Sequence, residues 1–467
     1  MIENVREAII DLVYLACAIV IILGLKRLST PRTARSGNQL IALGLLVAVA
    51  VTLLDPHIEW RLANVVVIVV GTVIGAAGSI YLARVVPMTA MPQMVALFNG
   101  MGGATAALVA VAEFQRFVAS GTVTGGERAS VAFGITVGSI AFTGSVIAFL
   151  KLQELMTGRP VRFPLQIPLN VAVAAGIVAM WIWLLGLGGS SAPVWILFGL
   201  ALLFGILLVL PVGGADMPVV ISVLNSMTGL AAAAAGFVLE NQILVVAGAL
   251  VGASGSLLTI LMSRAMNRSL ANVLFGAYRV RAGGAAVGEA KPIRETTVED
   301  TAVLLAYANL VIIVPGYGLA VAQAQHELAE LANELEKRGV EVKFAIHPVA
   351  GRMPGHMNVL LAEANIPYDK LYEMEQINEE FQRADVALIV GANDVVNPAA
   401  RTDPSSPLYG MPILNADQAK NVIVLKRSMR PGFAGVENEL FHMPQTRMLF
   451  GDAKETLKRL IEAVKSV

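Results

Sequence analysis

Nine long apolar runs before residue 270 constrain the fold of this chain more than any other feature of its sequence. They lie near residues 8–25, 38–54, 63–86, 92–114, 129–152, 168–187, 193–210, 218–239 and 241–263. Each is close to the ~20 residues that an α-helix needs to cross ~30 Å of hydrocarbon. Only 15% of the 467 residues are charged, whereas a soluble domain is about a quarter charged. The sequence therefore predicts an all-α membrane bundle of about nine transmembrane helices.

Lysine and arginine flank these runs unevenly. Nine spans place the two ends of the chain on opposite sides of the membrane, so the connections fall into two groups. The cations on the side of the C-terminus are Lys26, Arg27, Arg32, Arg35, Arg84, Lys151, Arg159, Arg162, Arg264 and Arg268. Those on the other side are Arg6, Arg61, Arg116 and Arg128. Because cytoplasmic connections carry the excess of Lys and Arg, we expect the C-terminal part in the cytoplasm.

Overall charge and cysteine content point to no further chemistry in the bundle. Thirty-four basic residues balance 34 acidic ones, so there is no electrostatic argument for nucleic-acid binding. Cys17 is the single cysteine and lies inside the first apolar run, where it fits a small packing residue. Glycines recur at four-residue spacing, which lets helix backbones approach closely. These pairs are Gly71/Gly75, Gly134/Gly138 and Gly248/Gly252.

The composition changes near residue 269. A stretch rich in glycine and alanine, 279–291, has no helical periodicity and is typical of a linker. After it, expected strands at 310–314, 341–346, 386–391, 421–426 and 447–450 alternate with expected helices at 297–308, 319–338, 355–364 and 452–465. This alternation predicts an α/β domain with a doubly wound parallel sheet, similar to a Rossmann fold. We expect a membrane domain at 1–268, a linker at 269–291 and a nucleotide-binding domain at 292–467.

The first of these strands leads directly into a glycine turn. The apolar residues 311–314 and Pro315 precede Gly316, Tyr317, Gly318 and, three residues later, Val321, a loosened G-x-G-x-x-V pattern. Such glycines allow a tight turn and a close approach of the backbone to a pyrophosphate, and the next helix offers amide donors. We expect these four residues to contact a dinucleotide.

Basic residues follow another strand and favour one cofactor over its relative. The expected strand 341–346 is followed by His347, where an NAD site would usually place an acid. The strand 421–426 instead delivers Lys426, Arg427 and Ser428, which suit a 2′-phosphate. A solvated basic strand end is the alternative. The missing acid and the cations together favour NADP over NAD.

Two polar loops follow other strand ends, where doubly wound sheets bind ligands. One, 347–356, contains Arg352, Met353 and Pro354, and its arginine can hold a phosphate. The other, 391–398, contains Gly391, Asn393 and Asp394, and its acid can act as a proton-linked switch. The alternative is that Asn393 and Asp394 form an ordinary turn, and that His347 and His356 are hydrogen-bonded loop histidines.

Polar residues are scarce in the apolar runs, so each is a candidate for function. Asp216 lies just before the eighth run, where an N-cap with Pro218 in the first turn is the alternative. Asn99 in the fourth run and Asn225 in the eighth can join helices through their amides or line a water path. No metal site is predicted.

Several long motifs resemble one family of membrane proteins. They are Pro-Val-Gly-Gly-Ala-Asp-Met-Pro-Val-Val-Ile-Ser at 211–222, Leu-Asn-Ser at 224–226, the run 231–236, the Gly316 turn, the loops 347–356 and 391–398, Lys-Arg-Ser at 426–428 and Gly-Phe-Ala-Gly at 432–435. With them the chain resembles, over essentially its whole length, the beta subunit of the proton-translocating nicotinamide nucleotide transhydrogenases.

This resemblance implies hydride transfer between NAD(H) and NADP(H) coupled to proton movement across the bacterial cytoplasmic membrane. The chain would supply the NADP(H) domain and most of the proton channel. A partner alpha subunit would bring the NAD(H) domain and further membrane helices, and two protomers would form a dimer. No catalytic side chain is implied, because the nicotinamides themselves carry the hydride.

The resemblance also implies roles for individual residues. Lys426, Arg427 and Ser428 would meet the 2′-phosphate, and Asp394 would be the coupling acid. The remaining implied nucleotide contacts are Gly316, Tyr317, Gly318, Val321, Arg352, Met353, Pro354, Gly391, Asn393, Gly432, Phe433 and Ala434. Asn99, Asp216 and Asn225 match membrane positions linked to proton passage and coupling.

Two residues depart from the pattern of many relatives. Asn99 stands where a histidine is common, and an amide cannot titrate at physiological pH. The proton carrier is then expected on a partner's helix, so this chain alone should not pump. Phe433 stands where a tyrosine often covers the nucleotide, which would remove a hydrogen bond worth about 0.5–1.5 kcal/mol.

A second class of protein fits the same architecture. A transporter or channel regulated by a cytoplasmic nucleotide-sensing domain would also join an apolar bundle to a Rossmann-like domain. It predicts no redox chemistry when an NAD(H) domain is added, and a polar substrate path through the bundle. The shortage of charged residues in the apolar runs speaks against that path.

Overall fold

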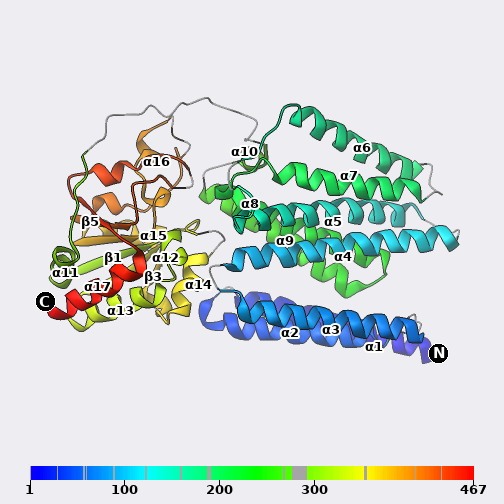
Figure 1. Cartoon of the computed structure of the whole chain (residues 1–467). Helices are drawn as coiled ribbons and strands as arrows, with labels where there is room; N and C mark the ends of the chain where they lie inside the picture. The colour runs from blue at the N-terminus through cyan, green and yellow to red at the C-terminus, as the bar shows by residue number, and fades with distance from the viewer. Residues whose placement is uncertain are drawn as a thin grey trace. The chain divides into compact units, whose positions relative to one another are not determined.

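The computed structural model describes residues 2–28, 30–55, 58, 60–87, 90–120, 124–157, 160–186, 191–266, 269–275, 292–351, 355–404, 406, 408–432 and 434–467. The chain divides into two compact units. We call the one built from the apolar helices the helical unit, and the one built around a β-sheet the sheet unit. Figure 1 shows the elements of both.

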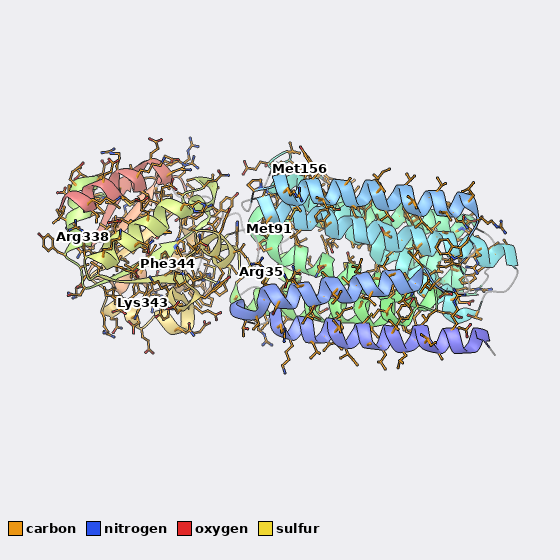
Figure 2. All side chains as sticks on the ribbon, turned by 90° about the horizontal axis from the view of Figure 1, so that it is seen from below. Arg35, Met91, Met156, Arg338, Lys343 and Phe344 are labelled. Carbon is orange, nitrogen blue, oxygen red and sulfur yellow. The ribbon has the colours of Figure 1, made fainter. Side chains whose placement is uncertain are left out.

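Nine helices within the described residues are long and apolar enough to cross a membrane. They are α1 (Ile2–Leu28), α2 (Pro31–Thr52), α3 (Leu62–Val85), α4 (Met91–Ser120), α5 (Gly125–Leu152), α6 (Gln166–Gly186), α7 (Ala192–Val209), α8 (Met217–Val238) and α9 (Gln242–Ala265). Most side chains along their flanks carry only carbon (Figure 2). The predicted membrane bundle of nine helices is confirmed.

Helix α5 is the most enclosed part of the helical unit, together with α8. Its start is fixed by a capping box, in which Thr124 and Glu127 each accept a hydrogen bond from the other's backbone N–H. Along its length it packs against α4, where a Cβ on Gly103 would lie 2.8 Å from the carbonyl oxygen of Gly138. Only glycine permits this approach of two helix backbones.

The glycine pairs predicted from spacing behave differently from one another. Gly134 and Gly138 on α5 pack against α4, and Gly248 and Gly252 on α9 pack against α8. By contrast, no atom of the described chain lies within 4 Å of a Cβ placed on Gly71 or Gly75 of α3. Helix α3 has no buried residue. The four-residue spacing therefore predicted close helix contacts correctly in α5 and α9 but not in α3.

Within the part of the chain that the structure describes, the sheet unit contains six parallel strands in the order β3-β2-β1-β4-β5-β6. They are β1 (Leu310–Pro315), β2 (Glu341–Ile346), β3 (Leu371–Glu373), β4 (Val386–Val390), β5 (Asn421–Lys426) and β6 (Thr446–Phe450). This is the strand order of a dinucleotide-binding doubly wound fold. The predicted α/β class and the five predicted strands are confirmed.

Alternating side chains of each strand enter two separate cores. On one face Val311 and Ile313 pack with helices α11 (Val298–Ala306), α13 (Gln325–Lys337), α14 (His356–Glu363) and α17 (Ala453–Ser466). On the other face Ile312 and Val314 pack with α15 (Met374–Ile377) and with 3-10 segments that include Phe381 and Phe441. The central strands are buried on both faces, as expected where helices cover both sides of a parallel sheet.

Three parts of the sheet unit differ from the sequence prediction. Strand β3 was missed because it has only three residues. The helix expected at 319–338 is two helices, α12 (Tyr317–Val321) and α13, since Gln323 between them adopts a left-handed conformation (φ 50°). A short helix, α10 (Leu270–Phe275), occupies the start of the expected linker, and residues 276–291 lie outside the described residues.

A segment at the start of the sheet unit also pairs with its last strand. Met448 N donates to Arg294 O (2.7 Å) and Thr296 N donates to Met448 O (3.0 Å). These bonds cover the outer edge of β6, which would otherwise expose unpaired backbone groups.

Candidate functional site

The candidate site lies at the carboxyl edge of the sheet, where the order of the strands reverses. Strands β1 and β4 are neighbours, with Pro315 opposite Val390, and each is followed at once by a glycine. In doubly wound sheets this switch point is where ligands bind. The residues predicted after β1, β4 and β5 therefore belong to one edge of the sheet.

The two glycines of the predicted fingerprint contact the loop that follows β4. Gly316 N donates to Val390 O and Gly318 N donates to Gly391 O, both at 2.9 Å. A Cβ on Gly318 would lie 2.7 Å from Cα of Gly391, and one on Gly316 would collide with the backbone of Ala392. Gly391 itself is left-handed, with φ 70°. These glycines therefore hold two site loops together at backbone distance.

The turn offers fewer free amides than its sequence pattern predicts. Helix α12 has only five residues, and Leu319 N already donates to Gly316 O at 3.0 Å. Tyr317 is half-buried, with its ring 6.3 Å from the ring of His356. Val321 is 45% exposed at the end of the helix. The turn thus presents its glycine backbone and the Tyr317 ring, while its first amides hydrogen-bond within the protein.

Asp394 connects the loop after β4 to the segment after β5. Its Oδ2 accepts a hydrogen bond from Ala434 N at 3.0 Å. A Cβ on Gly432 would lie 2.5 Å from Oδ1 of the same carboxylate, so a larger residue there would displace the Asp394 side chain. Asn438 adds a second connection, since its Nδ2 donates to the backbone oxygen of Asn393 at 3.0 Å. The sequence prediction placed Asn393, Asp394, Gly432 and Ala434 in one site, and the structure brings these four residues together; Asn438 was not predicted.

Lys426 belongs to the same cluster. Its ammonium donates to Arg430 O and lies 4.8 Å from the ring centre of Phe441. With the Asn393 amide assigned so that its neighbours are satisfied, the Asn393 oxygen accepts from Lys426 Nζ at 3.0 Å. Burial lowers the pKa of Lys426 to about 8, and the negative charge of Asp394 partly opposes that shift.

Lys426, Arg427 and Ser428 form what we call the basic motif. Arg427 is exposed and Ser428 is half-buried at the carboxyl end of β5. Two cations and a hydroxyl are the donor set that a phosphate monoester prefers. No acid follows β2, where Ile346 is succeeded by His347. The residues present therefore fit a nucleotide that carries an additional phosphate.

His347 fastens the loop after β2 to a neighbouring segment. It is buried, its Nδ1 accepts from Val349 N (3.2 Å), and its Nε2 lies 2.8 Å from Pro412 O. Since Nδ1 is an acceptor, Nε2 carries the proton and donates to that carbonyl. Burial lowers the pKa of His347, which favours this neutral form. The interpretation of His347 as a hydrogen-bonded loop histidine is confirmed.

Asn397, in the loop after β4, is a structural residue that sequence reasoning missed. Asn397 is fully buried; it donates to Glu437 O and accepts from Ala399 N, both at 3.0 Å. An asparagine before a proline was the only available signal, and it also fits an ordinary turn.

The predicted contacts outside the described residues are Arg352, Met353, Pro354 and Phe433.

Of the three polar residues predicted in or next to the apolar helices, Asn99 contacts two neighbouring helices. Asn99 of α4 donates from Nδ2 to Ser145 Oγ of α5 at 2.9 Å, and Thr228 Oγ1 of α8 donates to Asn99 O at 3.4 Å. Asn225 is half-buried on α8, one turn before Thr228. Asp216 is the last residue of a 3-10 turn, Gly214–Asp216, directly before α8.

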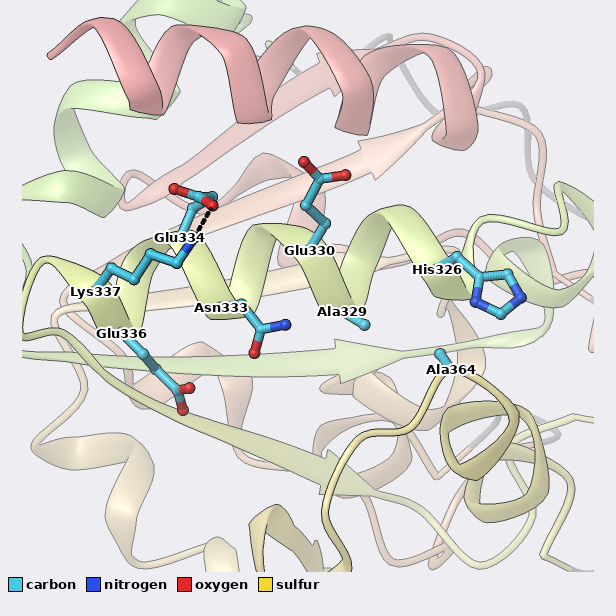
Figure 3. A pocket seen from close by; sticks show the side chains of 8 residues that line it. All are labelled: His326, Ala329, Glu330, Asn333, Glu334, Glu336, Lys337 and Ala364. Atoms are coloured by element: carbon cyan, nitrogen blue, oxygen red, sulfur yellow. Dashed lines mark hydrogen bonds and ion pairs between the residues drawn. The ribbon is translucent and has the colours of Figure 1, made fainter.

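A shallow pocket elsewhere on the sheet unit holds none of the predicted site residues. It has a volume of about 760 Å³ and runs along α13 (Figure 3). Its lining residues are His326, Ala329, Glu330, Asn333, Glu334, Glu336, Lys337 and Ala364. Lys337 and Glu334 form an ion pair there. Its solvated helical surface does not resemble a dinucleotide site.

Known proteins match this chain over almost its full length. The model of the family described as NAD(P) transhydrogenase beta subunit matches residues 10–463. The chain is 49% identical over 459 residues to the NAD(P) transhydrogenase subunit beta of Rhodospirillum rubrum, and the match covers 97% of this chain and 98% of that protein. A protein of the same name from a defined strain of that species matches equally.

Proposed function

Because this chain belongs to the family of NAD(P) transhydrogenase beta subunits, we propose that it binds NADP(H) at the carboxyl edge of its sheet. We further propose that it supplies most of the membrane part of an enzyme that couples hydride exchange between NAD(H) and NADP(H) to proton translocation. The bound nicotinamides supply the hydride chemistry. The side chains of this chain bind the nucleotide and link its binding to proton movement.

The observation that carries this proposal is the connection between the basic motif and Asp394. Lys426 Nζ and Gly432 N both donate to the side-chain oxygen of Asn393. The carboxylate of the next residue, Asp394, lies against Gly432 and accepts from Ala434 N. A phosphate held by Lys426, Arg427 and Ser428 therefore lies beside the same two loops that hold the carboxylate. A change in the protonation of Asp394 is then expected to alter these loops and the affinity for the nucleotide.

The membrane part is proposed to work with a partner. Asn99, Ser145 and Thr228 form a hydrogen-bonded contact of α4, α5 and α8, but none of them titrates at physiological pH. We therefore assign the proton carrier to a helix of an alpha subunit, which also brings the NAD(H) domain. The proposed assembly is a dimer of such protomers in the bacterial cytoplasmic membrane, with the sheet unit in the cytoplasm.

Nucleotide binding to the full chain in detergent tests this proposal. Titration calorimetry should detect NADPH and reveal at most weak binding of NADH. Replacing both Lys426 and Arg427 with alanine should weaken NADPH binding by about 3 kcal/mol, roughly 150-fold, because two charge-assisted contacts are lost. The same double variant should leave the already weak NADH binding unchanged.

Lys420→Ala is a matched control, because Lys420 pairs with Asp385 at the opposite, amino edge of the sheet. It should leave NADPH affinity unaltered. Equal binding of NADPH and NADH would contradict the assignment of the basic motif. Reconstitution with an alpha subunit then decides between classes: absence of hydride exchange would favour a transporter regulated by nucleotide.

A further inference from the structure

One buried cation in the helical unit has no part in the function proposed above. Among the described side chains of lysine, arginine, aspartate and glutamate, only that of Lys151 is buried, with 3% exposed. Its position near the end of an apolar run made it one of the cations expected in a cytoplasmic connection. Instead, its ammonium points into the protein, where an uncompensated charge would be costly.

The ammonium of Lys151 binds the end of a neighbouring helix. Lys151 lies in the last turn of α5 and donates to the backbone oxygens of Val209 and Leu210, at the end of α7. Val161 N also donates to Leu210 O, at 3.3 Å. The last four carbonyls of a helix have no donors within that helix. Here the following residue is Pro211, which has no N–H to offer.

Both helices favour a cation at this point. Helices α5 and α7 each end here, and the C-terminal ends of helices carry partial negative charge. Two turns earlier the same pair is closely packed, since Thr143 Oγ1 donates to Leu202 O at 2.8 Å. A Cβ on Gly205 would lie 2.7 Å from Ile140 O. Lys151 therefore closes a rigid contact between α5 and α7.

The chain that leaves this contact leads directly to a proposed coupling residue. After Leu210 it passes through Pro211, Gly213 and Gly214 to Asp216, and α8 begins at the next residue. Only the six residues 211–216 lie between Leu210 and the start of α8, so the position of Leu210 limits where this segment can run. Lys151 binds the carbonyl oxygen of Leu210.

We propose that Lys151 is a positioning residue that fixes the start of the segment carrying Asp216, and so sets how tightly proton movement is coupled to hydride exchange. This inference rests on the proposed function, because it takes the coupling role of Asp216 from there. Lys151 is not among the nucleotide contacts proposed for the sheet unit. Its loss should leave nucleotide binding intact and loosen coupling.

The test uses the full chain reconstituted with an alpha subunit in vesicles that contain a pH-sensitive dye. Hydride exchange and proton uptake are measured together, and their ratio gives protons moved per hydride. Lys151→Met keeps the length of the side chain and removes its charge and donors. We expect this ratio to fall at least about fivefold, the lower end of typical coupling effects. NADPH affinity in detergent should stay within about twofold of the unaltered chain.

Three further variants separate positioning from general stability. Lys151→Arg keeps the cation and should restore most of the ratio. Lys151→Gln removes the charge but keeps an NH2 donor group, and it carries the test if Lys151→Met does not fold. Arg84→Met removes an exposed cation in the last turn of α3 and should change nothing. An unchanged ratio in Lys151→Met and Lys151→Gln would overturn the inference.

A proportional loss of NADPH binding and of the ratio, without rescue by Lys151→Arg, would also overturn the inference, because it would show a purely structural role. The proposed function fails in a different way. In that case the unaltered chain itself shows no hydride exchange with an alpha subunit, whatever stands at position 151.

Discussion

The helical unit and the sheet unit both bring backbones together at glycines, but they fill the space around those contacts with different chemistry. In the helical unit Gly103 meets Gly138, and the nearby polar groups are the neutral side chains of Asn99, Ser145 and Thr228. In the sheet unit Gly318 meets Gly391, and the nearby polar groups include Asp394 and Lys426. The same packing device therefore supports neutral hydrogen bonds in one unit and charged groups in the other.

Solvation explains this difference. A charge inside an apolar bundle loses its hydration, whereas a charge at the carboxyl edge of the sheet keeps part of it and has an opposite charge nearby. Neutral amides and hydroxyls can join helices without that cost. Lys151 fits the same rule, since it is buried at the ends of two helices, where backbone carbonyls replace water.

The largest effect is expected from a methyl group at Gly316. Because a Cβ there would collide with the backbone of Ala392, Gly316→Ala should lower the free energy of unfolding of the sheet unit by about 3 kcal/mol. Hydrogen exchange of sheet-unit peptides in the full chain, followed over a urea series, measures this loss. Gly339→Asn is the control, since Gly339 has open space around it and asparagine accepts its left-handed φ of 86°. Equal stability of Gly316→Ala and Gly339→Asn would mean that the turn after β1 and the loop after β4 can move apart without loss of free energy.

A smaller effect is expected from the matching change in the helical unit. Gly103→Ala would press a methyl group against Gly138 O and should lower stability by about 2 kcal/mol, because two helix backbones must move apart. Thermal unfolding of the purified chain in detergent, detected by tryptophan fluorescence, follows this change. Gly71→Ala on α3 should be neutral or slightly stabilising, since it meets no atom of the described chain. A loss at Gly71 equal to that at Gly103 would contradict the distinction between these helices.

The smallest effect concerns the charge of Lys426. Its ammonium form prevails below its pKa of about 8 and is lost above it. Under the proposed contact between this ammonium and the 2′-phosphate, NADPH affinity should fall about tenfold, or 1.4 kcal/mol, for one pH unit above 8. Titration calorimetry between pH 7 and pH 9 measures this fall. The variant Lys426→Arg should abolish the fall, because an arginine side chain stays charged over this whole range.

Two further measurements test the direction of this pH dependence. Asp394→Asn removes the charge that holds the pKa of Lys426 up, so the fall in affinity should begin at lower pH. Without nucleotide the opposite trend is expected. Because the folded pKa is below the ordinary 10.5, the unfolded chain binds more protons between about 8 and 10.5, and stability should rise with pH there. Parallel trends in affinity and stability would contradict this role of Lys426.

Most of the fold was predictable because it follows from the spacing and length of the apolar runs. Apolar runs of membrane length and short apolar strands between amphipathic helices predicted the nine long helices and five of the six strands found among the described residues. Strand β3 and the break at Gln323 were not predictable, because a three-residue strand has no period and a left-handed glutamine has no sequence signal. The role of the segment around Arg294 depends on pairing with a strand far away in the chain.

The site was predictable in composition but not in connectivity. Glycine spacing and the basic motif identified Gly316, Gly318 and Lys426, and the parallel sheet explains why they share an edge. That Gly318 binds Gly391 follows only from the strand order, which places β4 beside β1. The burial of Lys151 was missed for a similar reason, since a lysine at the end of an apolar run usually extends into water.

The pairing of Arg294 and Thr296 with Met448 has a consequence for how the protein is made. Arg294 also donates to Pro444 O, 150 residues later in the sequence. During synthesis, Arg294 and Thr296 leave the ribosome long before β6 has been made. Their pairing with Met448 therefore forms only when synthesis of the sheet unit is almost complete. Contacts between such distant residues form slowly. The apolar helices emerge from the ribosome before this step. A stop codon shortly before residue 446 would therefore leave them attached to an aggregation-prone sheet that lacks β6.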